Sequence, residues 1–336
     1  MAKIGIIGAG SWGLGLSILL NNNGHDVTIW SVFEEELEVL RQKHENEKCL
    51  PGVKIPETIK FNGNTKEVVE WADVLVLAVA SPYTRTTATK LAPFVKKGQY
   101  IVNVGKGIEE SSLKTLCQVI EDEIPQAIVA VLSGPSHAEE VGRGIPTTCV
   151  IGTDKKKDAI YLQNIFMSDV FRVYISPDVL GICLGGSLKN VIALAAGIAD
   201  GLGYGDNTKA ALITRGIAEI SRLGVAMGAK VETFAGLSGI GDLIVTCSSM
   251  HSRNRRAGIL IGKGYSKDDA MKEVKMVVEG VYSAKAALLL SQKFNVSMPI
   301  VEQTNKILFE GKSPSEAVLE LMLRDKKIEA DNISWE

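Results

Sequence analysis

The first half of the chain alternates short apolar runs with segments of helical periodicity. Residues 74–79, Val-Leu-Val-Leu-Ala-Val, are apolar at every position, as is typical of a strand buried on both faces of a parallel sheet. Between such runs, apolar residues recur every three or four positions. The pattern predicts a parallel sheet covered by helices. The expected strands are Lys3–Ile7, Val27–Trp30, Val74–Val79, Tyr100–Val104, Ile128–Leu132, Thr148–Ile151 and Phe171–Ile175, and the expected helices are Trp12–Asn22, Glu34–Lys43, Tyr83–Val95, Ser112–Glu121 and Lys156–Phe166.

The pattern changes after Ser176-Pro177-Asp178, and we expect no further strand. Residues 208–227 carry apolar side chains at helical spacing. Ser266 followed by Asp269, and Ser313 followed by Pro314 and Glu316, are typical of capped helix starts. The predicted fold class is therefore an α/β N-terminal domain with a Rossmann-type doubly wound sheet (residues 1–180), followed by an all-α C-terminal domain (residues 181–336).

The longest apolar tract, Leu180–Ala199, is long enough to cross a membrane but has Lys189 and Asn190 at its centre. We interpret it as a buried helix of a soluble protein. No other charge lies between Asp178 and Asp200, which favours burial of Lys189 as well. Burial disfavours the ammonium form and lowers the pKa of a lysine toward the range useful for acid–base chemistry. The alternative is a lysine whose stem packs while its ammonium group reaches solvent.

Composition and charge exclude several classes of protein. Hydrophobic residues make up 46% and charged residues 23% of the 336 residues, which suits two packed domains and argues against disorder. The 37 Lys and Arg against 39 Asp and Glu give a net charge of −2, so no global attraction to nucleic acid or to an anionic membrane is expected. Five dispersed cysteines without a C-x-x-C pair and four scattered histidines predict neither a disulfide framework nor a metal site. We expect a cytoplasmic protein with no nucleic-acid partner and no membrane insertion.

Glycine is over-represented, with 33 residues in the chain, against a usual share of roughly 7%. One group of these, Gly8-Ala9-Gly10-Ser11-Trp12-Gly13, matches G-x-G-x-x-G between the first predicted strand and the first predicted helix. In that context Gly8 makes a tight turn, Gly10 lets the backbone approach a pyrophosphate, and Gly13 lets the helix pack closely on the strand. The sequence predicts that this loop, with Ser11 and Trp12, binds a dinucleotide.

The position that usually discriminates NAD from NADP is unusual here. The second predicted strand is followed by Ser31-Val32-Phe33, which offers neither an acid for a ribose 2′-hydroxyl nor an arginine for a 2′-phosphate. Glu34, Glu35 and Glu36 come next, although acids are also favourable in the first turn of any helix. A Glu34 carboxylate facing the ribose would repel a 2′-phosphate, so the sequence leans to NAD over NADP.

Further segments extend the pattern across nearly the whole chain. They are residues 104–109 (Val-Gly-Lys-Gly-Ile-Glu), 132–140 (Leu-Ser-Gly-Pro-Ser-His-Ala-Glu-Glu), 186–193 (Gly-Ser-Leu-Lys-Asn-Val-Ile-Ala), 241–247 (Gly-Asp-Leu-Ile-Val-Thr-Cys), 251–254 (His-Ser-Arg-Asn) and 278–280 (Val-Glu-Gly). With the glycine loop they resemble the bacterial NAD(P)-dependent glycerol-3-phosphate dehydrogenase family. The resemblance implies reversible reduction of dihydroxyacetone phosphate to sn-glycerol 3-phosphate with NAD or NADP, which supplies glycerophospholipid synthesis. It also implies a possible homodimer.

The resemblance assigns catalytic roles to three residues. Lys189 is the implied proton donor in reduction and acceptor in oxidation. Lys106, in a glycine-flanked loop after a predicted strand, is the implied contact to substrate and nicotinamide, and a second cation near Lys189 would lower its pKa further. Asp242 is implied to lie near Lys189 and the substrate hydroxyls. Without the resemblance, Lys106 is typical of a solvated loop and Asp242 of a helix cap or turn.

The densest basic segment, residues 251–256, combines hydroxyl, amide and guanidinium donors suited to a phosphate. Within it, Arg255 and Arg256 match no family position and are expected on a solvated helix face. His137 and His251 are not expected to be acid–base groups, because spacing shows no carboxylate partner and the family assigns the proton to lysine. By resemblance, the substrate contacts are Lys106, Gly134, Ser136, Lys189, Asp242, Thr246, Ser252, Arg253 and Asn254, and the cofactor contacts outside the glycine loop are Phe33, Lys106, Ala138, Arg253, Val277 and Glu279.

Two other functions stay open on the residues alone. A hydroxyacid or sugar-acid dehydrogenase can share the two-domain plan, and would need an arginine for a carboxylate and no phosphate site. A dinucleotide-sensing regulatory protein would tolerate loss of Lys189 or Asp242, and would bring a segment for nucleic acid or a partner protein. No such segment is visible in the sequence.

Overall fold

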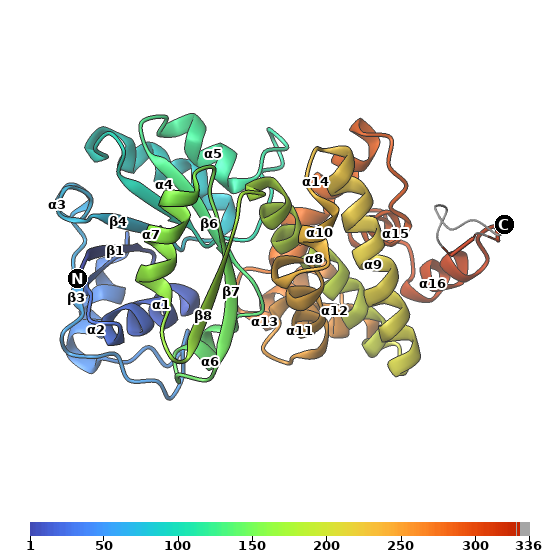
Figure 1. Cartoon of the computed structure of the whole chain (residues 1–336). Coiled ribbons are helices and arrows are strands. Elements are labelled where there is room, and N and C mark those ends of the chain that lie inside the picture. The colour runs from blue at the N-terminus through green and yellow to red at the C-terminus, as the bar shows by residue number, and fades with distance from the viewer. Residues whose placement is uncertain (327, 330–336) are drawn as a thin grey trace.

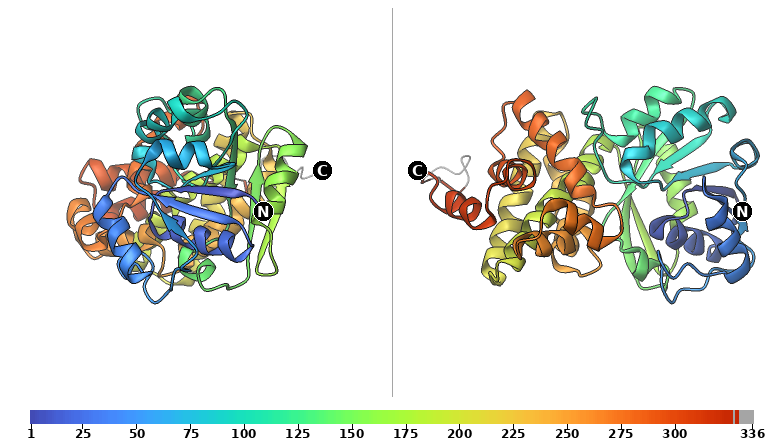
Figure 2. Two further views of the ribbon diagram at one scale, coloured as in Figure 1. Left: turned by 90° about the vertical axis from the view of Figure 1, so that its left-hand side faces the viewer. Right: turned by 180° about the vertical axis from the view of Figure 1, so that it is seen from behind.

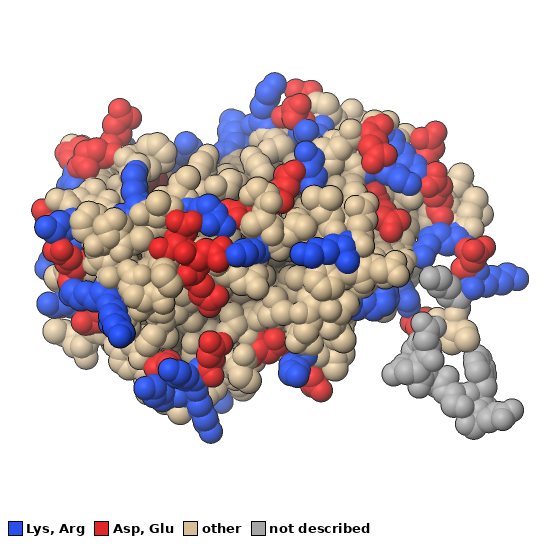
Figure 3. Space-filling model, turned by 90° about the horizontal axis from the view of Figure 1, so that it is seen from above, with Lys and Arg blue, Asp and Glu red and all other residues tan. Residues whose placement is uncertain are grey.

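The chain folds into a sheet-containing half and a helical half that lie side by side (Figure 1). The structure is a computed structural model that describes residues 1–326 and 328–329. In the right-hand view of Figure 2, the N-terminus and helix α16 (Pro314–Met322) lie at opposite ends of the molecule. On the face shown in Figure 3, positive and negative side chains are interspersed, in keeping with a net charge near zero.

The sheet has eight strands in the order β3-β2-β1-β4-β5-β6-β7-β8. All seven predicted strands are present, with ends within two residues of those predicted. The sheet is parallel as predicted except at one pair, where β7 runs antiparallel to β6. A strand of only two residues, β3, was not predicted, because it is too short to show a periodicity. The strands are β1 (Lys3–Ile7), β2 (Asp26–Trp30), β3 (Lys60–Phe61), β4 (Val74–Leu77), β5 (Tyr100–Asn103), β6 (Ile128–Ser133), β7 (Thr147–Gly152) and β8 (Phe171–Ser176).

Helices cover both faces of the sheet, because successive side chains of each buried strand point to opposite sides. Ile4 and Ile6 pack with α1, α2 and α7 on one face, whereas Ile7 packs with α3, α4 and α5 on the other. This doubly wound arrangement confirms the predicted fold class. The helices of this half are α1 (Ser11–Asn22), α2 (Glu34–Lys43), α3 (Thr65–Trp71), α4 (Thr84–Leu91), α5 (Leu116–Glu123), α6 (Ala138–Val141) and α7 (Lys156–Phe166).

The predicted helix ends are right for α2 and α7 and wrong for two other helices. The segment predicted as one helix over 83–95 consists of α4 flanked by two short 3₁₀ turns, and each turn contains a proline. The helix predicted from Ser112 begins instead after Thr115, whose side chain forms a capping box with Gln118. Helix α3, which follows the Asn64 cap, was not predicted.

The second half is helical, and residues 177–326 and 328–329 contain no strand. Its central helix is α8 (Val179–Gly201), where every residue from Gly181 to Ala199 except Ala195 is buried. Within the described residues α8 alone is long and apolar enough to cross a membrane, and its burial confirms the prediction of a core helix. As predicted, Ser266 and Ser313 cap the helices that follow them. The remaining elements are α9 (Asp206–Ala226), α10 (Val231–Phe234), η3 (Leu237–Gly241), α11 (Asp242–Ser248), α12 (Arg253–Gly262), α13 (Lys267–Val274), α14 (Glu279–Lys293) and α15 (Pro299–Phe309).

Two pairs of glycines let α8 and α12 touch backbone to backbone. Gly197 and Gly201 are four residues apart on α8, and Gly258 and Gly262 are four apart on α12. A Cβ at Gly197 would lie 2.2 Å from the carbonyl oxygen of Arg255, and one at Gly258 would lie 2.2 Å from that of Leu194. Small residues at i and i+4 permit this close approach. Part of the glycine excess therefore serves helix packing, and it fixes α12 against the helix that carries Lys189.

Candidate active site

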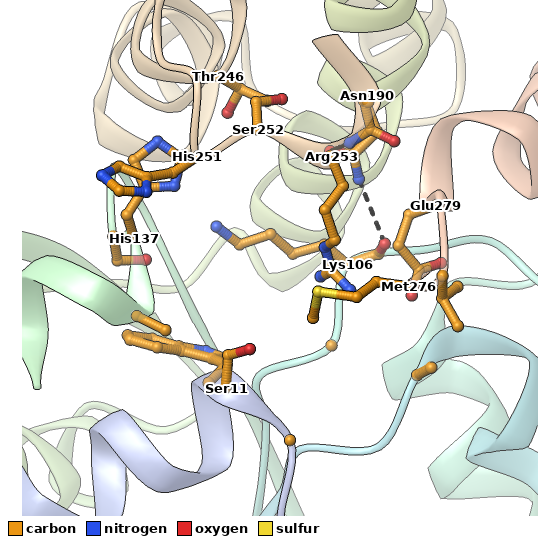
Figure 4. Close-up of a pocket in the computed structure, with 18 of the residues that line it drawn as sticks. Ser11, Lys106, His137, Asn190, Thr246, His251, Ser252, Arg253, Met276 and Glu279 are labelled. Carbon is orange, nitrogen blue, oxygen red and sulfur yellow. Dashed lines mark hydrogen bonds between the residues drawn. The ribbon is translucent and has the colours of Figure 1, made fainter. Parts of the chain in front are cut away.

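A pocket lies between the two halves and is lined from both. Figure 4 shows Lys106, Arg253, Met276 and Glu279 close together, with His137 and His251 at one side and Ser11 at another. The sheet half contributes loops that follow β1, β4, β5 and β6, and the helical half contributes α8, α11, α12 and α14 with adjoining loops. The lining residues are Gly10–Trp12, Ala78–Ala80, Val104–Lys106, Ser136–Glu139, Lys189, Asn190, Thr246, His251–Asn254, Arg256, Met276, Val277 and Glu279.

The glycine loop places the N-terminus of α1 at the wall of this pocket. Gly8 has a φ of +118°, a conformation that favours glycine, and a Cβ at Gly13 would lie 2.1 Å from the Gly8 carbonyl oxygen. Nothing lies within 4 Å of the Cβ position of Gly10, and no side chain caps the first turn of α1. The backbone N–H groups of Ser11 and Trp12 are therefore open to an anion at the positive end of the helix dipole. These residues fit the pyrophosphate of a dinucleotide.

Beside the pocket, Asp242 joins two lysines from different halves. Its Oδ1 lies 2.5 Å from Nζ of Lys189 on α8, and its Oδ2 lies 2.7 Å from Nζ of Lys106 in the loop after β5. Lys189 Nζ also donates to Thr246 Oγ1 at 2.6 Å, and Lys106 Nζ donates to the carbonyl oxygen of Gly134 at 3.0 Å. One buried carboxylate thus holds two ammonium groups at the same site.

The pKa of Lys189 is lowered to about 8, because burial and the nearby Lys106 charge lower it by more than the opposing charge of Asp242 raises it. The side chain of Lys189 is 7% exposed, so the ammonium group does not reach bulk solvent. The arrangement therefore contains an amine that can change protonation state near neutral pH, which is the requirement for general acid–base chemistry.

The loop that carries Lys106 is held by both halves. Ser187 Oγ on α8 donates to the carbonyl oxygen of Gly107 at 2.9 Å, and the Asn190 side chain donates to that of Lys106 at 3.4 Å. At the far end of the loop, Arg85 on α4 donates to both carboxylate oxygens of Glu109, at 2.8 and 2.6 Å. This double anchoring positions Lys106 opposite Asp242.

The N-terminus of α12 faces the pocket. Ser252 caps the helix by accepting a hydrogen bond from the Arg255 N–H at 3.2 Å. Asn254 donates to Asn190 Oδ1 at 2.9 Å and accepts from the Gly280 N–H at 2.7 Å, which ties α12 to α8 and α14. The guanidinium of Arg253 makes no hydrogen bond with any residue that the structure describes and remains available to a ligand.

A second contact crosses between the halves at Glu279, the first residue of α14. Its carboxylate accepts the backbone N–H of Ser81 at 3.1 Å and the Ser81 hydroxyl. Burial raises the pKa of Glu279, while the Ser81 hydrogen bonds oppose the rise. Glu279 therefore closes one side of the pocket.

Comparison with known proteins shows the family of this chain. A family model described as NAD-dependent glycerol-3-phosphate dehydrogenase N-terminus matches residues 3–159, and the corresponding C-terminus model matches residues 178–319. The chain belongs to the NAD-dependent glycerol-3-phosphate dehydrogenase family. The resemblance stated from the sequence motifs is confirmed.

Relatives match this family member from end to end. It is 65% identical over 335 residues to a glycerol-3-phosphate dehydrogenase (NAD(P)+) of Agathobacter rectalis, with 100% of each chain covered. It is 60% identical over 339 residues to one of Fusobacterium nucleatum, again with 100% of each chain covered. A crystal structure of glycerol-3-phosphate dehydrogenase from Coxiella burnetii has a TM-score of 0.93 and 36% identity, and covers 96% of this chain and 99% of that one.

Most of the residues singled out from the sequence of this family member lie at the pocket. Gly8 and Gly13 do not line the pocket but shape the glycine loop. Gly134 and Asp242 do not line the pocket either, but both accept hydrogen bonds from Lys106, which does. Phe33 is 68% exposed at the start of α2, outside the lining. The predicted residues in the lining are Gly10, Ser11, Trp12, Lys106, Ser136, Ala138, Lys189, Thr246, Ser252, Arg253, Asn254, Val277 and Glu279.

The prediction that Arg255 and Arg256 form a solvated helix face is wrong. Arg255 is 13% exposed and pairs with Asp200 at 2.7 Å, and Arg256 lines the pocket. Sequence reasoning also missed Asn190 and Ser81, which link elements distant in the chain. Helical spacing could have found Arg256, since it lies three residues after Arg253 and thus on the same face.

The histidines and the acids near the pocket form no metal site. His137 and His251 lie with ring centroids 5.6 Å apart, and His251 Nδ1 lies 3.9 Å from Glu139 Oε1, a partner that sequence spacing had not shown. Across the residues that the structure describes, no group of three or more His, Cys, Asp or Glu side chains could hold a metal ion. Burial lowers the pKa of His137, which favours the neutral form of its ring.

Proposed function

We propose that this chain reduces dihydroxyacetone phosphate to sn-glycerol 3-phosphate with NADH or NADPH, and catalyses the reverse oxidation. The observation that carries the proposal is the buried Lys189, joined through Asp242 to Lys106 beside a pocket onto which the α1 glycine loop opens. The names of the relatives from Agathobacter rectalis and Fusobacterium nucleatum support it.

Lys189 is the proposed proton donor. A bound nicotinamide supplies a hydride to the carbonyl carbon, so the carbonyl oxygen must gain one proton to become the hydroxyl of the product. The Lys189 ammonium holds that proton, and a pKa of about 8 leaves it mostly protonated at neutral pH yet able to release it. Lys106 adds positive charge where the oxygen becomes negative, and Asp242 keeps both ammonium groups in place.

The remaining substrate contacts are proposed from the pocket and the family motif together. Arg253 at the start of α12 is the proposed phosphate ligand, because its guanidinium is unpaired among the described residues and can bind two phosphate oxygens. Ser252 and Asn254 flank it. Gly134, Ser136 and Thr246 complete the proposed substrate set around Lys106 and Lys189.

The cofactor is proposed to lie along the glycine loop with its pyrophosphate on the N–H groups of Ser11 and Trp12. Ala138, Arg253, Val277 and Glu279 line the same pocket and are the proposed contacts further along it. Phe33, exposed next to the end of β2, is a proposed contact to the adenosine half.

We further propose that residues 1–180 form the cofactor domain and residues 181–336 the substrate domain, with reduction occurring in the cytoplasm. The sheet ends at Ser176 and α8 starts at Val179, which supports a boundary there. All five cysteines are free thiols, as suits a reducing compartment.

The test is the oxidation of NADH by the purified protein, followed by absorbance, with dihydroxyacetone phosphate as the second substrate. We expect turnover with this ketone, and far lower kcat/KM with unphosphorylated dihydroxyacetone. Turnover with a 2-oxo or 3-oxo acid, and none with dihydroxyacetone phosphate, would refute the proposal.

A further inference from the structure

The first turn of α12 directs two arginines to the pocket, and only Arg253 is part of the family motif. Arg256 lies three residues after Arg253, so the two side chains emerge on the same helix face, and both line the pocket. A third arginine in this turn, Arg255, behaves differently. Arg255 Nε lies 2.7 Å from Asp200 Oδ2, and its Nη1 donates to the carbonyl oxygen of Ser248 at 2.9 Å.

Arg256 lacks a partner of this kind. Its Nε is shielded from solvent and has no acceptor, and no nitrogen of its guanidinium forms a hydrogen bond or ion pair within the part of the chain that the structure describes. A buried donor of a charged group that is left without an acceptor is costly, more so than for a neutral group. An anionic oxygen in the pocket would remove that cost.

The charges around the pocket indicate which kind of anion it would bind. Lys106 and Lys189 are both paired with Asp242. Of the two acids in the lining, Glu279 accepts two hydrogen bonds from Ser81, and Glu139 lies nearest to His251, at 3.9 Å. Arg253 and Arg256 are therefore left as two cations with no ion pair or hydrogen bond to a described residue, although the charge of Arg253 partly offsets the rise that burial causes in the pKa of Glu279. A phosphate monoester carries about −1.5 to −2 charges at neutral pH, which matches that pair.

We propose that Arg256 is a second guanidinium that binds a phosphate oxyanion in this pocket, beside Arg253. The inference rests on the proposed function and adds to it a phosphate-binding residue that the family motif does not contain. Arginine suits the role because its planar fork can bind two oxygens of one phosphate. The oxyanion belongs either to the phosphate of the substrate or to the pyrophosphate of the cofactor, and the two sources predict different measurements.

The experiment compares Arg256→Met with Lys263→Met, which removes the same charge from the exposed C-terminal end of α12. Calorimetry measures the Kd of NADH alone and then the Kd of sn-glycerol 3-phosphate, and steady-state kinetics measures KM and kcat for dihydroxyacetone phosphate. We expect Arg256→Met to weaken one ligand by about tenfold or more, and Lys263→Met to change neither by more than about twofold. Weaker binding of sn-glycerol 3-phosphate with a raised KM for dihydroxyacetone phosphate identifies the substrate phosphate as the oxyanion. Weaker binding of NADH identifies the pyrophosphate of the cofactor.

Arg256→Lys separates charge from geometry, and is expected to restore part of the lost affinity. Thermal melting of each variant shows whether it is folded, so that a loss of affinity is not read from an unfolded protein. Unchanged Kd and KM values in a folded Arg256→Met variant would overturn the inference. A wild-type protein that binds NADH and glycerol 3-phosphate but does not turn over dihydroxyacetone phosphate would instead refute the proposed function, and the binding comparison would still decide the role of Arg256.

Discussion

Lys106 Nζ lies 2.7 Å from Asp242 Oδ2, although the two residues belong to different halves of the molecule. The same carboxylate also holds Lys189. Asp242 therefore positions both the proposed proton donor, Lys189, and the proposed polarising cation, Lys106. A substitution at any of the three residues should affect the other two.

Replacing Lys189 with Met should lower kcat by about 10²- to 10⁴-fold, because the variant has no proton donor at the carbonyl oxygen. The Kd of NADH should stay within about twofold, since the glycine loop is untouched. Stopped-flow kinetics and fluorescence titration measure the two quantities. A variant that keeps wild-type kcat would exclude Lys189 as the donor.

The two directions of the reaction should depend on pH in opposite ways. Burial lowers the pKa of Lys189 to about 8. Reduction needs the ammonium, so its kcat/KM should fall as pH rises through about 8, whereas oxidation needs the neutral amine and should speed up over the same interval. Initial rates in both directions across this range provide the check, and profiles that are flat in both directions would contradict it.

Replacing Asp242 with Asn should shift the pH profile of reduction to lower pH. The Asp242 charge raises the pKa of Lys189, and its removal leaves the effects of burial and of Lys106 unopposed. Asp200→Asn is the matched control, because Asp200, on the same helix as Lys189, likewise pairs with two cations, Lys209 and Arg255, but does not touch Lys189. An unshifted profile for Asp242→Asn would show that this coupling is absent.

The protein should bind NADH about tenfold or more tightly than NADPH, because the acid at the end of β2 faces a 2′-phosphate with like charge. The side-chain partners lead us to expect that this acid is Glu36, whereas the sequence favoured Glu34. Glu34 lies 2.6 Å from Arg41, whereas Glu36 accepts a 2.7 Å hydrogen bond from Ser31 directly after β2.

Glu36→Gln should therefore narrow the ratio of the two Kd values, measured by fluorescence titration, more than the control Glu34→Gln does. A larger effect of Glu34→Gln would favour Glu34 as the acid beside the ribose, as the sequence suggested. A wild-type preference for NADPH would contradict the role of either acid.

Gly258→Ala should destabilise the fold by about 1–3 kcal/mol, because the added methyl group would overlap the backbone of α8. Its Cβ would lie 2.2 Å from the Leu194 carbonyl oxygen. Since α12 also carries Arg253, the KM for dihydroxyacetone phosphate should rise as well. Gly205→Ala is the control, because nothing lies within 4 Å of its Cβ position. Equal melting temperatures for the two variants would contradict this account of the glycine pairs.

Sequence alone predicted the features that depend on local patterns. Apolar runs located all seven strands longer than two residues, and the glycine loop was located between β1 and α1 because its turn and helix start are encoded by adjacent residues. Burial of Lys189 followed from the apolar helix around it, since no polar face was available to expose it. Family motifs named the residues that the fold then brought to one pocket.

Only the tertiary structure decided how distant residues meet. The antiparallel pairing of β7 and the Asp200 partner of Arg255 depend on which segments pack together, and spacing along the chain does not carry that information. The same holds for Asp242, whose two lysine partners lie 53 and 136 positions away. Long-range contacts of this kind are set by the docking of whole elements, as the glycine-mediated packing of α8 against α12 does for Asp200 and Arg255, and so appear only once the chain is folded.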